Sequence, residues 1–191
     1  MRAMGQAGDS DRALQVGLLS RVTVAATLTG AAVVHGTVVG EHLSEWAPAG
    51  LFFLFLVVLE AGLGVLALLG WSRSVALLAI VSGLGTVAIW AVSRTVGMPI
   101  GPADFQVPEG VGVPDVVCGV LELVAVGVCA VSLARPGRAR LKAVPRGRAR
   151  FAPIGVVVAA IALVTAYGVA PAMSGEAHHH GEVESVSAPA R

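Results

Sequence analysis

Apolar residues in this chain are gathered into five long runs that are separated by polar segments. The runs cover residues 14–40, 49–70, 74–93, 114–134 and 154–170. A helix rises about 1.5 Å per residue, so runs of this length match a hydrocarbon core about 30 Å thick. Because a segment in lipid has to satisfy its own backbone hydrogen bonds, each run is predicted to be an α-helix. The pattern predicts an all-α, polytopic transmembrane helix bundle with a four-helix core and a fifth helix.

The polar segments predict how the chain is divided. We expect a disordered cytoplasmic N-terminus at 1–13, a four-helix membrane core at 14–134 with an outer loop at 94–113, a basic cytoplasmic connection at 135–153, a fifth transmembrane helix at 154–172 and a disordered outer tail at 173–191. Pro171 is expected to stop the fifth helix, since proline has no backbone N–H to donate. A cleaved signal peptide is the rival interpretation of the first run. That run is longer than a signal-peptide core and Trp46-Ala47-Pro48-Ala49 is a poor cleavage site, which favours an uncleaved helix.

Composition agrees with burial in lipid. Of the 191 residues, 55% are hydrophobic and 13% are charged, with a mean hydropathy of +0.81. A soluble domain carries about 25% charged residues, so a soluble globular protein is excluded. Cys118 and Cys129 fall in one predicted helix about 16 Å apart, which is too far for a disulfide.

Basic residues determine the predicted orientation. Seven of the thirteen Lys and Arg residues fall between Arg135 and Arg150. Cytoplasmic loops carry such an excess, so this connection and the N-terminus are predicted to be cytoplasmic in the cell membrane, and the C-terminus outside. The connections at 41–48 and 94–113 are then outer. A basic run beside a span is a topology signal that meets the lipid bilayer, and we expect no nucleic-acid partner.

Ionisable side chains inside the predicted helices are functional candidates, because placing them in lipid is costly. His35 and His42 are about two turns apart and lie nearly on one face of the first helix. Glu60 falls close to the middle of the second helix. The fourth helix carries one stripe of polar residues, Asp115, Cys118, Glu122 and Cys129. If these three helices are neighbours, a histidine, two carboxylates and a thiol converge on the order of 10 Å below the outer surface.

Three interpretations of this convergence remain open. Imidazole and carboxylate suit zinc, iron or copper and a thiolate favours zinc or copper(I), which makes His35, His42 and Glu122 candidate ligands of copper or zinc. A proton relay between carboxylates would instead suit a proton-coupled transporter. The structural interpretation is that Glu60 and Glu122 are protonated or bonded to Thr and Ser of neighbouring helices, and hold the bundle together around a packed His35.

The segment 90–115 differs in kind from the apolar runs beside it. Its prolines restrict φ, and Gly97 and Gly101 permit turns that other residues resist. Arg94 is expected to pair with Asp115 or Glu109, and an exposed pair of this kind contributes at most ~1 kcal/mol. We predict that the segment forms an outward cap over His35 and Glu122.

Tryptophans and glycines have structural interpretations. Trp46 and Trp90 near the predicted outer ends, with Trp71 near the inner face, fit an aromatic belt. Six glycines are expected to let helices approach closely. They are Gly36, Gly40, Gly62, Gly64, Gly83 and Gly85.

The C-terminal tail carries His178, His179 and His180 with three glutamates around them. Neighbouring imidazoles and carboxylates bind Cu²⁺, Ni²⁺ or Zn²⁺ weakly, and a solvated tail is the alternative. No glycine-rich phosphate loop, nucleophile elbow or thiol redox pair occurs in the sequence, and we expect no enzyme activity.

One set of residues resembles a family. The set comprises His35 with Glu41-His42, Gly50-Leu51-Phe52-Phe53, the segment SRTxGxPxGP from Ser93 to Pro102, Glu109-x-Val111-Gly112, Asp115 and Glu122. It resembles small multi-pass membrane proteins of actinobacteria, an uncharacterised family, over about residues 20–135. The resemblance implies that 41–48 and 94–115 form one outer face. It implies no activity, ligand or catalytic residue.

These observations lead to two functional hypotheses. In the first, the protein is a non-enzymatic membrane protein that holds a metal ion or small ligand in its outer half. The residues of this site are His35, His42, Glu60, Arg94, Asp115 and Glu122. In the second, it is a structural or accessory subunit that packs through its glycine-rich faces against a membrane-protein partner or a second copy of itself.

Overall fold

The computed structural model describes residues 2–134 and 152–174, with side chains at 15–134 and 152–170. Its elements are α1 (Arg2–Glu45), α2 (Ala47–Leu69), α3 (Arg73–Thr95), the 3₁₀ helix η1 (Ala103–Gln106), α4 (Val113–Ala134) and α5 (Ala152–Ser174). The described residues contain no strand, and five of the helices are long and apolar enough to cross a membrane. The prediction of an all-α transmembrane bundle is confirmed. The chain is a multi-pass membrane protein whose surroundings are a lipid bilayer.

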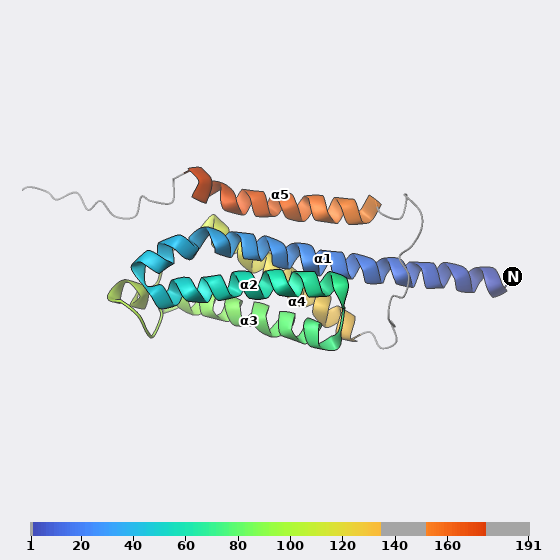
Figure 1. The fold of residues 1–191 in the computed structure, drawn as a ribbon, viewed down its shortest axis with the longest axis horizontal. Helices are drawn as coiled ribbons and strands as arrows, with labels where there is room; N and C mark the ends of the chain where they lie inside the picture. The colour runs from blue at the N-terminus through green and yellow to red at the C-terminus, as the bar shows by residue number, and fades with distance from the viewer. Residues whose placement is uncertain (1, 135–151, 175–191) are drawn as a thin grey trace, which may run out of the picture.

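Helices α1 and α4 pack against each other, and α5 lies against both (Figure 1). Helix α2 packs along α1 and α3 packs along α4, whereas α2 and α3 touch each other much less. Two glycines let α5 lie against the four-helix core. A Cβ added at Gly30 would lie 2.5 Å from Thr165 Oγ1, and one at Gly168 would lie 2.6 Å from Val117 Cγ1. Larger side chains at these positions would push the fifth helix away.

The bundle has two dissimilar ends. The loop end carries Trp46, between α1 and α2, and the segment 96–112, between α3 and α4. The far end carries the turn 70–72 between α2 and α3. There Ser72 caps α3, since its hydroxyl accepts a hydrogen bond from the backbone N–H of Val75 at 3.2 Å. The turn is therefore short and well defined.

The loop end corrects one sequence prediction. Residues 41–48 were expected to form a connection, but α1 continues to Glu45 and α2 begins at Ala47. Trp46 alone separates the two helices, with extended backbone at φ −155°. Its N–H still donates to the His42 carbonyl at 2.9 Å. Pro48 lies in the first turn of α2, where proline needs no donor. The acidic residues at 41–45 are thus helical.

The start of α1 and the end of α5 also differ from prediction. Residues 2–13 were expected to be disordered, but α1 begins at Arg2. A helix already formed in the membrane extends at little cost, because only the first turn is expensive to nucleate. Pro171 was expected to end the last helix, but α5 continues to Ser174. Proline is tolerated in membrane helices because only a local part of the hydrogen-bond ladder is lost.

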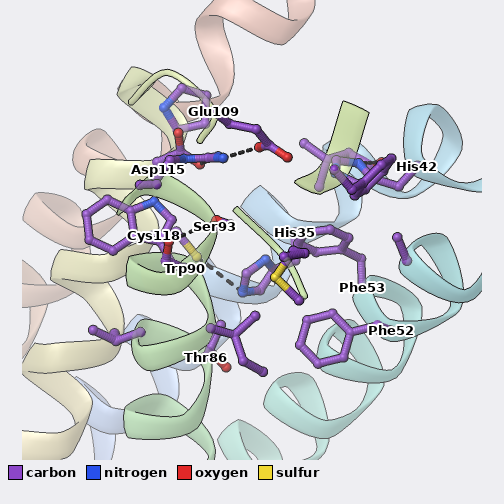
Figure 2. Close-up of a pocket in the computed structure, with 18 of the residues that line it drawn as sticks. His35, His42, Phe52, Phe53, Thr86, Trp90, Ser93, Glu109, Asp115 and Cys118 are labelled. Carbon is purple, nitrogen blue, oxygen red and sulfur yellow. Dashed lines mark hydrogen bonds and ion pairs between the residues drawn. The ribbon is translucent and has the colours of Figure 1, made fainter. Parts of the chain in front are cut away.

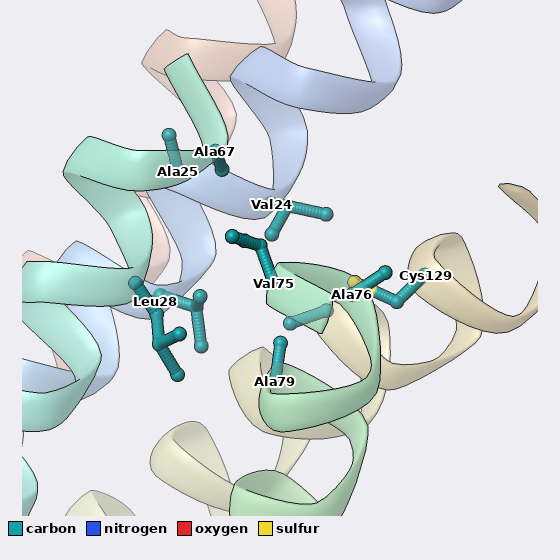
Figure 3. Packing of buried hydrophobic residues seen from close by; sticks show 10 residues of the cluster. Val24, Ala25, Leu28, Ala67, Val75, Ala76, Ala79 and Cys129 are labelled. Carbon is teal, nitrogen blue, oxygen red and sulfur yellow. The ribbon is translucent and has the colours of Figure 1, made fainter. Parts of the chain in front are cut away.

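A cluster of small apolar side chains fills the far-end half of the bundle (Figure 3). Its buried members are Val24, Ala25, Leu28, Leu63, Ala67, Val75, Ala76, Ala79, Ala125 and Cys129. Small residues let helix backbones approach closely in lipid. Gly64 is one contact of this kind, because a Cβ there would lie 3.2 Å from the Ala25 carbonyl oxygen. The glycine prediction is wrong for Gly40, Gly62 and Gly85, where an added Cβ would meet nothing within 4 Å.

Candidate metal centre and adjoining cavity

Three helices bring four ionisable side chains together in the loop-end half. His35 comes from α1, Glu60 from α2, and Cys118 and Glu122 from α4, and together they form the polar cluster. The His35 ring nitrogen Nε2 lies 3.5 Å from Glu60 Oε1, 3.5 Å from Glu122 Oε1 and 3.3 Å from Cys118 Sγ. One imidazole nitrogen is thus the common neighbour of two carboxylates and a thiol.

The side chains of the polar cluster are almost fully buried. Its exposed fractions are 7% for His35, 1% for Glu60, 6% for Cys118 and 2% for Glu122. Neither carboxylate oxygen of Glu60 has a hydrogen-bond partner among the described residues. A buried polar group without a partner costs about 1–3 kcal/mol, and more if it is charged. The two buried carboxylates thus share one imidazole at 3.5 Å, which is long for a hydrogen bond, and a bound cation or a further donor would stabilise them.

The geometry brings together four of the residues singled out in the sequence. His35, Glu60 and Glu122 converge, because α1 contacts both α2 and α4. Cys118 lies one turn before Glu122 on the same face of α4 and joins them. Donor atoms of His35, Cys118 and Glu122 all lie within 4.8 Å of one another. The signal for Cys118 was its place on the polar stripe, although the candidate metal ligands did not include it.

His42 does not reach the polar cluster. Its Nδ1 lies 2.9 Å from the Val38 carbonyl oxygen. Its ring packs against Phe53 with centroids 4.5 Å apart, and against Phe105 at 6.0 Å. The prediction of His42 as a metal ligand beside His35 is therefore wrong. The seven-residue spacing puts both rings on one face, but the rings lie too far apart along the helix to meet.

A cavity of about 350 Å³ adjoins the polar cluster. Side chains of α1, α2, α3, α4 and the 96–112 segment line it, and His35, Cys118 and Glu122 stand at one part of its wall. In Figure 2, Cys118 and His35 point toward each other, and Phe52 and Phe53 lie on the opposite side from Trp90. Most of the remaining wall is apolar or aromatic. The void has the size and lining of a small-molecule site.

An ion-paired roof closes the cavity at the loop end. Arg94 donates to Asp115 Oδ1 at 2.8 Å and also pairs with Glu109. Asp115 in turn accepts from the Gly112 N–H at 2.7 Å. The expectation of an exposed pair is corrected, since the Arg94 side chain is 15% exposed. Partial burial increases the contribution of this ion pair to stability, because removing one partner would leave an uncompensated charge away from water.

The 96–112 loop contributes to the wall of the cavity that also contains His35 and Glu122, which agrees with the predicted cap over these two residues. Gly97 and Gly101 have φ of +79° and +108°, which favours glycine at both positions. The Met98 N–H donates to the Phe105 carbonyl at 2.7 Å, which closes the loop on itself. Phe105 is 9% exposed and packs between His42 and Trp46. The loop thus lines the same cavity as His35 and Glu122.

Trp90 has surroundings that the sequence did not predict. The aromatic-belt interpretation concerned its depth in the membrane, and the structure adds that Trp90 lines the cavity. Its indole N–H is buried and has no acceptor among the described residues. Trp71 packs against the small-residue cluster at the far end, and Trp46 packs against Phe105.

Several predictions concern residues outside the described part of the chain. They are the basic connection at 135–150 and the histidines His178, His179 and His180. Comparisons of the chain with protein-family models, with curated proteins and with solved structures gave no match. The geometry of the polar cluster and of the cavity is therefore the basis for the proposed function.

Proposed function

We propose that this protein binds a zinc ion at the polar cluster, in the outer half of a cell-membrane bundle. The observation that carries the proposal is the meeting of His35, Cys118 and Glu122, whose donor atoms lie within 4.8 Å of one another. The buried carboxylate of Glu60 stands next to them without a hydrogen-bond partner among the described residues.

The spacing of the donors suits zinc. Tetrahedral zinc with its usual bonds to nitrogen, oxygen and sulfur separates its ligand atoms by about 3.3–3.6 Å. His35 Nε2 lies 3.3 Å from the Cys118 sulfur and 3.5 Å from each glutamate oxygen. Zinc accepts nitrogen, sulfur and carboxylate ligands together, whereas copper(I) prefers soft sulfur donors. The Glu122 carboxylate in this set therefore favours zinc over copper.

Charge balance supports a divalent cation. Glu60 and Glu122 lie at 1% and 2% exposure in membrane-spanning helices. Carboxylates in such positions are stable only when they are neutralised, paired or bound to a metal. A zinc ion held by the Glu122 carboxylate, the Cys118 thiolate and the neutral His35 imidazole would balance the two negative charges of its ligands. Glu60 would lie next to this site in its neutral form and hydrogen-bond to it from outside the ligand group.

The proposed orientation rests on charge. The basic residues between Arg135 and Arg150 favour the cytoplasmic side for that connection. The loop end then faces outward, because α4 ends at Ala134 on the side that leads into this basic stretch. Zinc would accordingly reach the polar cluster from outside the cell.

Metal analysis of purified protein tests the proposal. Wild-type protein, extracted in mild detergent without an affinity histidine tag and incubated with zinc, is expected to retain about one zinc per chain after dialysis. Cys118→Ala and His35→Ala should lose it. Cys129→Ala is the matched control, since it removes a buried cysteine from the same helix outside the polar cluster. A variant with His178, His179 and His180 all replaced by alanine controls for binding at the tail.

Two results would overturn the proposal. One is a wild-type protein that keeps no zinc under these conditions. The other is a Cys118→Ala protein that keeps as much zinc as Cys129→Ala. Cobalt substitution adds a spectroscopic check, because a thiolate–cobalt charge-transfer band should appear in wild type and be absent from Cys118→Ala.

A further inference from the structure

We propose that the cavity beside the polar cluster binds a neutral, lipophilic molecule with a flat ring body and a carbonyl oxygen. This site lies mainly between the aromatic side chains of α2 and the inward face of α3. The proposal does not depend on a metal at the polar cluster. It rests on the cavity wall and on two buried donors on α3.

The wall suits a flat, apolar body. Phe52 and Phe53 from α2 line the cavity together with Phe105 and Trp46 from the loop end. The aromatic rings pack edge to face, with centroids 5.7 Å apart for Phe52 and Phe53 and 5.6 Å for Trp46 and Phe105. Aromatic rings arranged in this way favour a further ring placed among them. A volume of about 350 Å³ has room for a ligand of small-molecule size.

Two buried donors lie in the opposite wall. Trp90 and Arg94 are one turn apart on α3 and both line the cavity. The indole N–H of Trp90 and the Nε–H of Arg94 are buried and have no acceptor among the described residues. Buried donors in native proteins almost always have partners, so we expect a bound molecule to supply the acceptor for these two donors. A carbonyl oxygen has two lone pairs and is able to accept from both groups.

The charge around these donors excludes an anion as the preferred ligand. The positive charge of Arg94 is already met by Asp115 at 2.8 Å and by Glu109. A ligand carboxylate would be a third negative group beside one guanidinium, and like charges in a low-dielectric site repel strongly. A neutral ketone supplies the acceptor without this repulsion.

The packing of the bundle provides a route from the bilayer. Helices α2 and α3 both line the cavity but touch each other much less than the other neighbouring helices do. Ile89, which lines the cavity from α3, is also 39% exposed on the helix surface. A lipid-soluble molecule would therefore enter between α2 and α3.

Binding of benzophenone tests this inference. Benzophenone has two rings joined by a carbonyl, and diphenylmethane has the same rings joined by a methylene group. We expect wild-type protein in detergent to bind benzophenone roughly fivefold more tightly than diphenylmethane, the effect of one net hydrogen bond. Tryptophan fluorescence quenching measures both affinities at equal partition into the micelle, and photolabelling by benzophenone should map to cavity residues. A charged analogue, 4-phenylbenzoate, should bind more weakly than benzophenone.

Variants distinguish the donor from the rest of the site. Trp90→Phe keeps a ring but removes the indole N–H, so the preference for benzophenone should fall while diphenylmethane binding changes little. Trp71→Phe at the far end is the matched control and should keep the preference. Because Trp90→Phe removes a fluorophore, calorimetry replaces quenching for this comparison. Equal binding of the two probes by wild type, or an unchanged preference in Trp90→Phe, would overturn the inference.

Metal-free wild-type protein separates this inference from the zinc proposal. Protein treated with EDTA should keep the preference for benzophenone even though it has lost any zinc. If the EDTA-treated protein loses the preference and Trp90→Phe keeps it, the carbonyl binds at the polar cluster and the assignment to α3 is wrong.

Discussion

The two buried cysteines of α4 occupy the same stripe of one helix in very different surroundings. Cys118, in the loop-end half, lies 3.3 Å from the His35 ring nitrogen and borders a cavity. Cys129, in the far-end half, lies in the cluster of small apolar side chains that includes Ala76 and Ala79 (Figure 3). The surroundings of the two cysteines are representative of the two halves of the bundle. One half is densely packed, and the other holds a cavity, buried charges and unpartnered donors.

The difference indicates that one half of the bundle stabilises the fold and the other half holds the candidate site. Proteins violate the rules of packing and polar satisfaction mainly at functional sites, and offset the cost elsewhere. Here the far-end half supplies close packing of small residues, while the loop-end half holds Glu60 at 1% exposure without a hydrogen-bond partner among the described residues. We expect substitutions in the two halves to have correspondingly different consequences.

A carboxylate placed in the far-end half should have the largest effect. Ala79 is 0% exposed and packs in an entirely apolar cluster. A charge at the centre of a membrane helix costs about 3 kcal/mol on insertion scales. Ala79→Glu should therefore lose most of its folded protein, as measured by the monodisperse fraction in size-exclusion chromatography after detergent extraction. Ala79→Ser is the control, since its hydroxyl can bond within the helix. An Ala79→Glu protein as well folded as wild type would mean that the two halves tolerate charge equally.

Removing the cation of the roof should have the next largest effect. Arg94→Ala leaves Glu109 and Asp115 without their partner at a half-buried position. The expected loss is about 2 kcal/mol of unfolding free energy, between the values for exposed and fully buried pairs. Denaturant unfolding in detergent micelles measures it. Arg73→Ala removes an exposed arginine at the far end and should change stability by less than about 0.5 kcal/mol. Equal losses in the two variants would contradict a stabilising roof.

Alkylation should distinguish the two cysteines directly. Cys118 borders the cavity, whereas Cys129 is 0% exposed within packed side chains. Reaction with N-ethylmaleimide depends on access to the sulfur, so Cys118 should react at least about tenfold faster. Mass spectrometry of Cys118→Ala and Cys129→Ala proteins isolates each rate. Zinc should slow the labelling of Cys118 and leave Cys129 unaffected. Similar rates for both cysteines would show that the cavity gives no access to Cys118.

Adding one methyl group at a glycine is the smallest of these changes. A Cβ at Gly64 would lie 3.2 Å from both the Ala25 carbonyl oxygen and Thr29 Oγ1, whereas one at Gly40 would meet nothing within 4 Å. Gly64→Ala should lose about 1 kcal/mol through overpacking. Gly40→Ala should gain up to about 1 kcal/mol from helix propensity. Thermal unfolding of both variants gives the comparison, and a stabilised Gly64→Ala protein would show that α1 and α2 have room to separate.

The amino-acid sequence alone determined the membrane helices and the depth of their polar residues. Runs of about twenty apolar residues form helices in lipid for local reasons, because each backbone must bond to itself. The depth of His35, Glu60 and Glu122 follows from helical rise. Their convergence was therefore predictable on the condition that α1, α2 and α4 are neighbours. The turns of the 96–112 loop were also indicated, by Gly97 and Gly101.

Only the tertiary structure decided which helices are neighbours and how each is rotated. Lipid tails are as apolar as the helix surfaces, so hydropathy carries little information about helix pairing, which depends on contacts between distant segments. Helix packing and rotation are therefore the reason that Cys118 meets His35 while His42 does not, and that Trp90 lines a cavity. The cavity is lined by residues of four helices and of the 96–112 segment, so it is a property of the packed bundle and of no single run of residues.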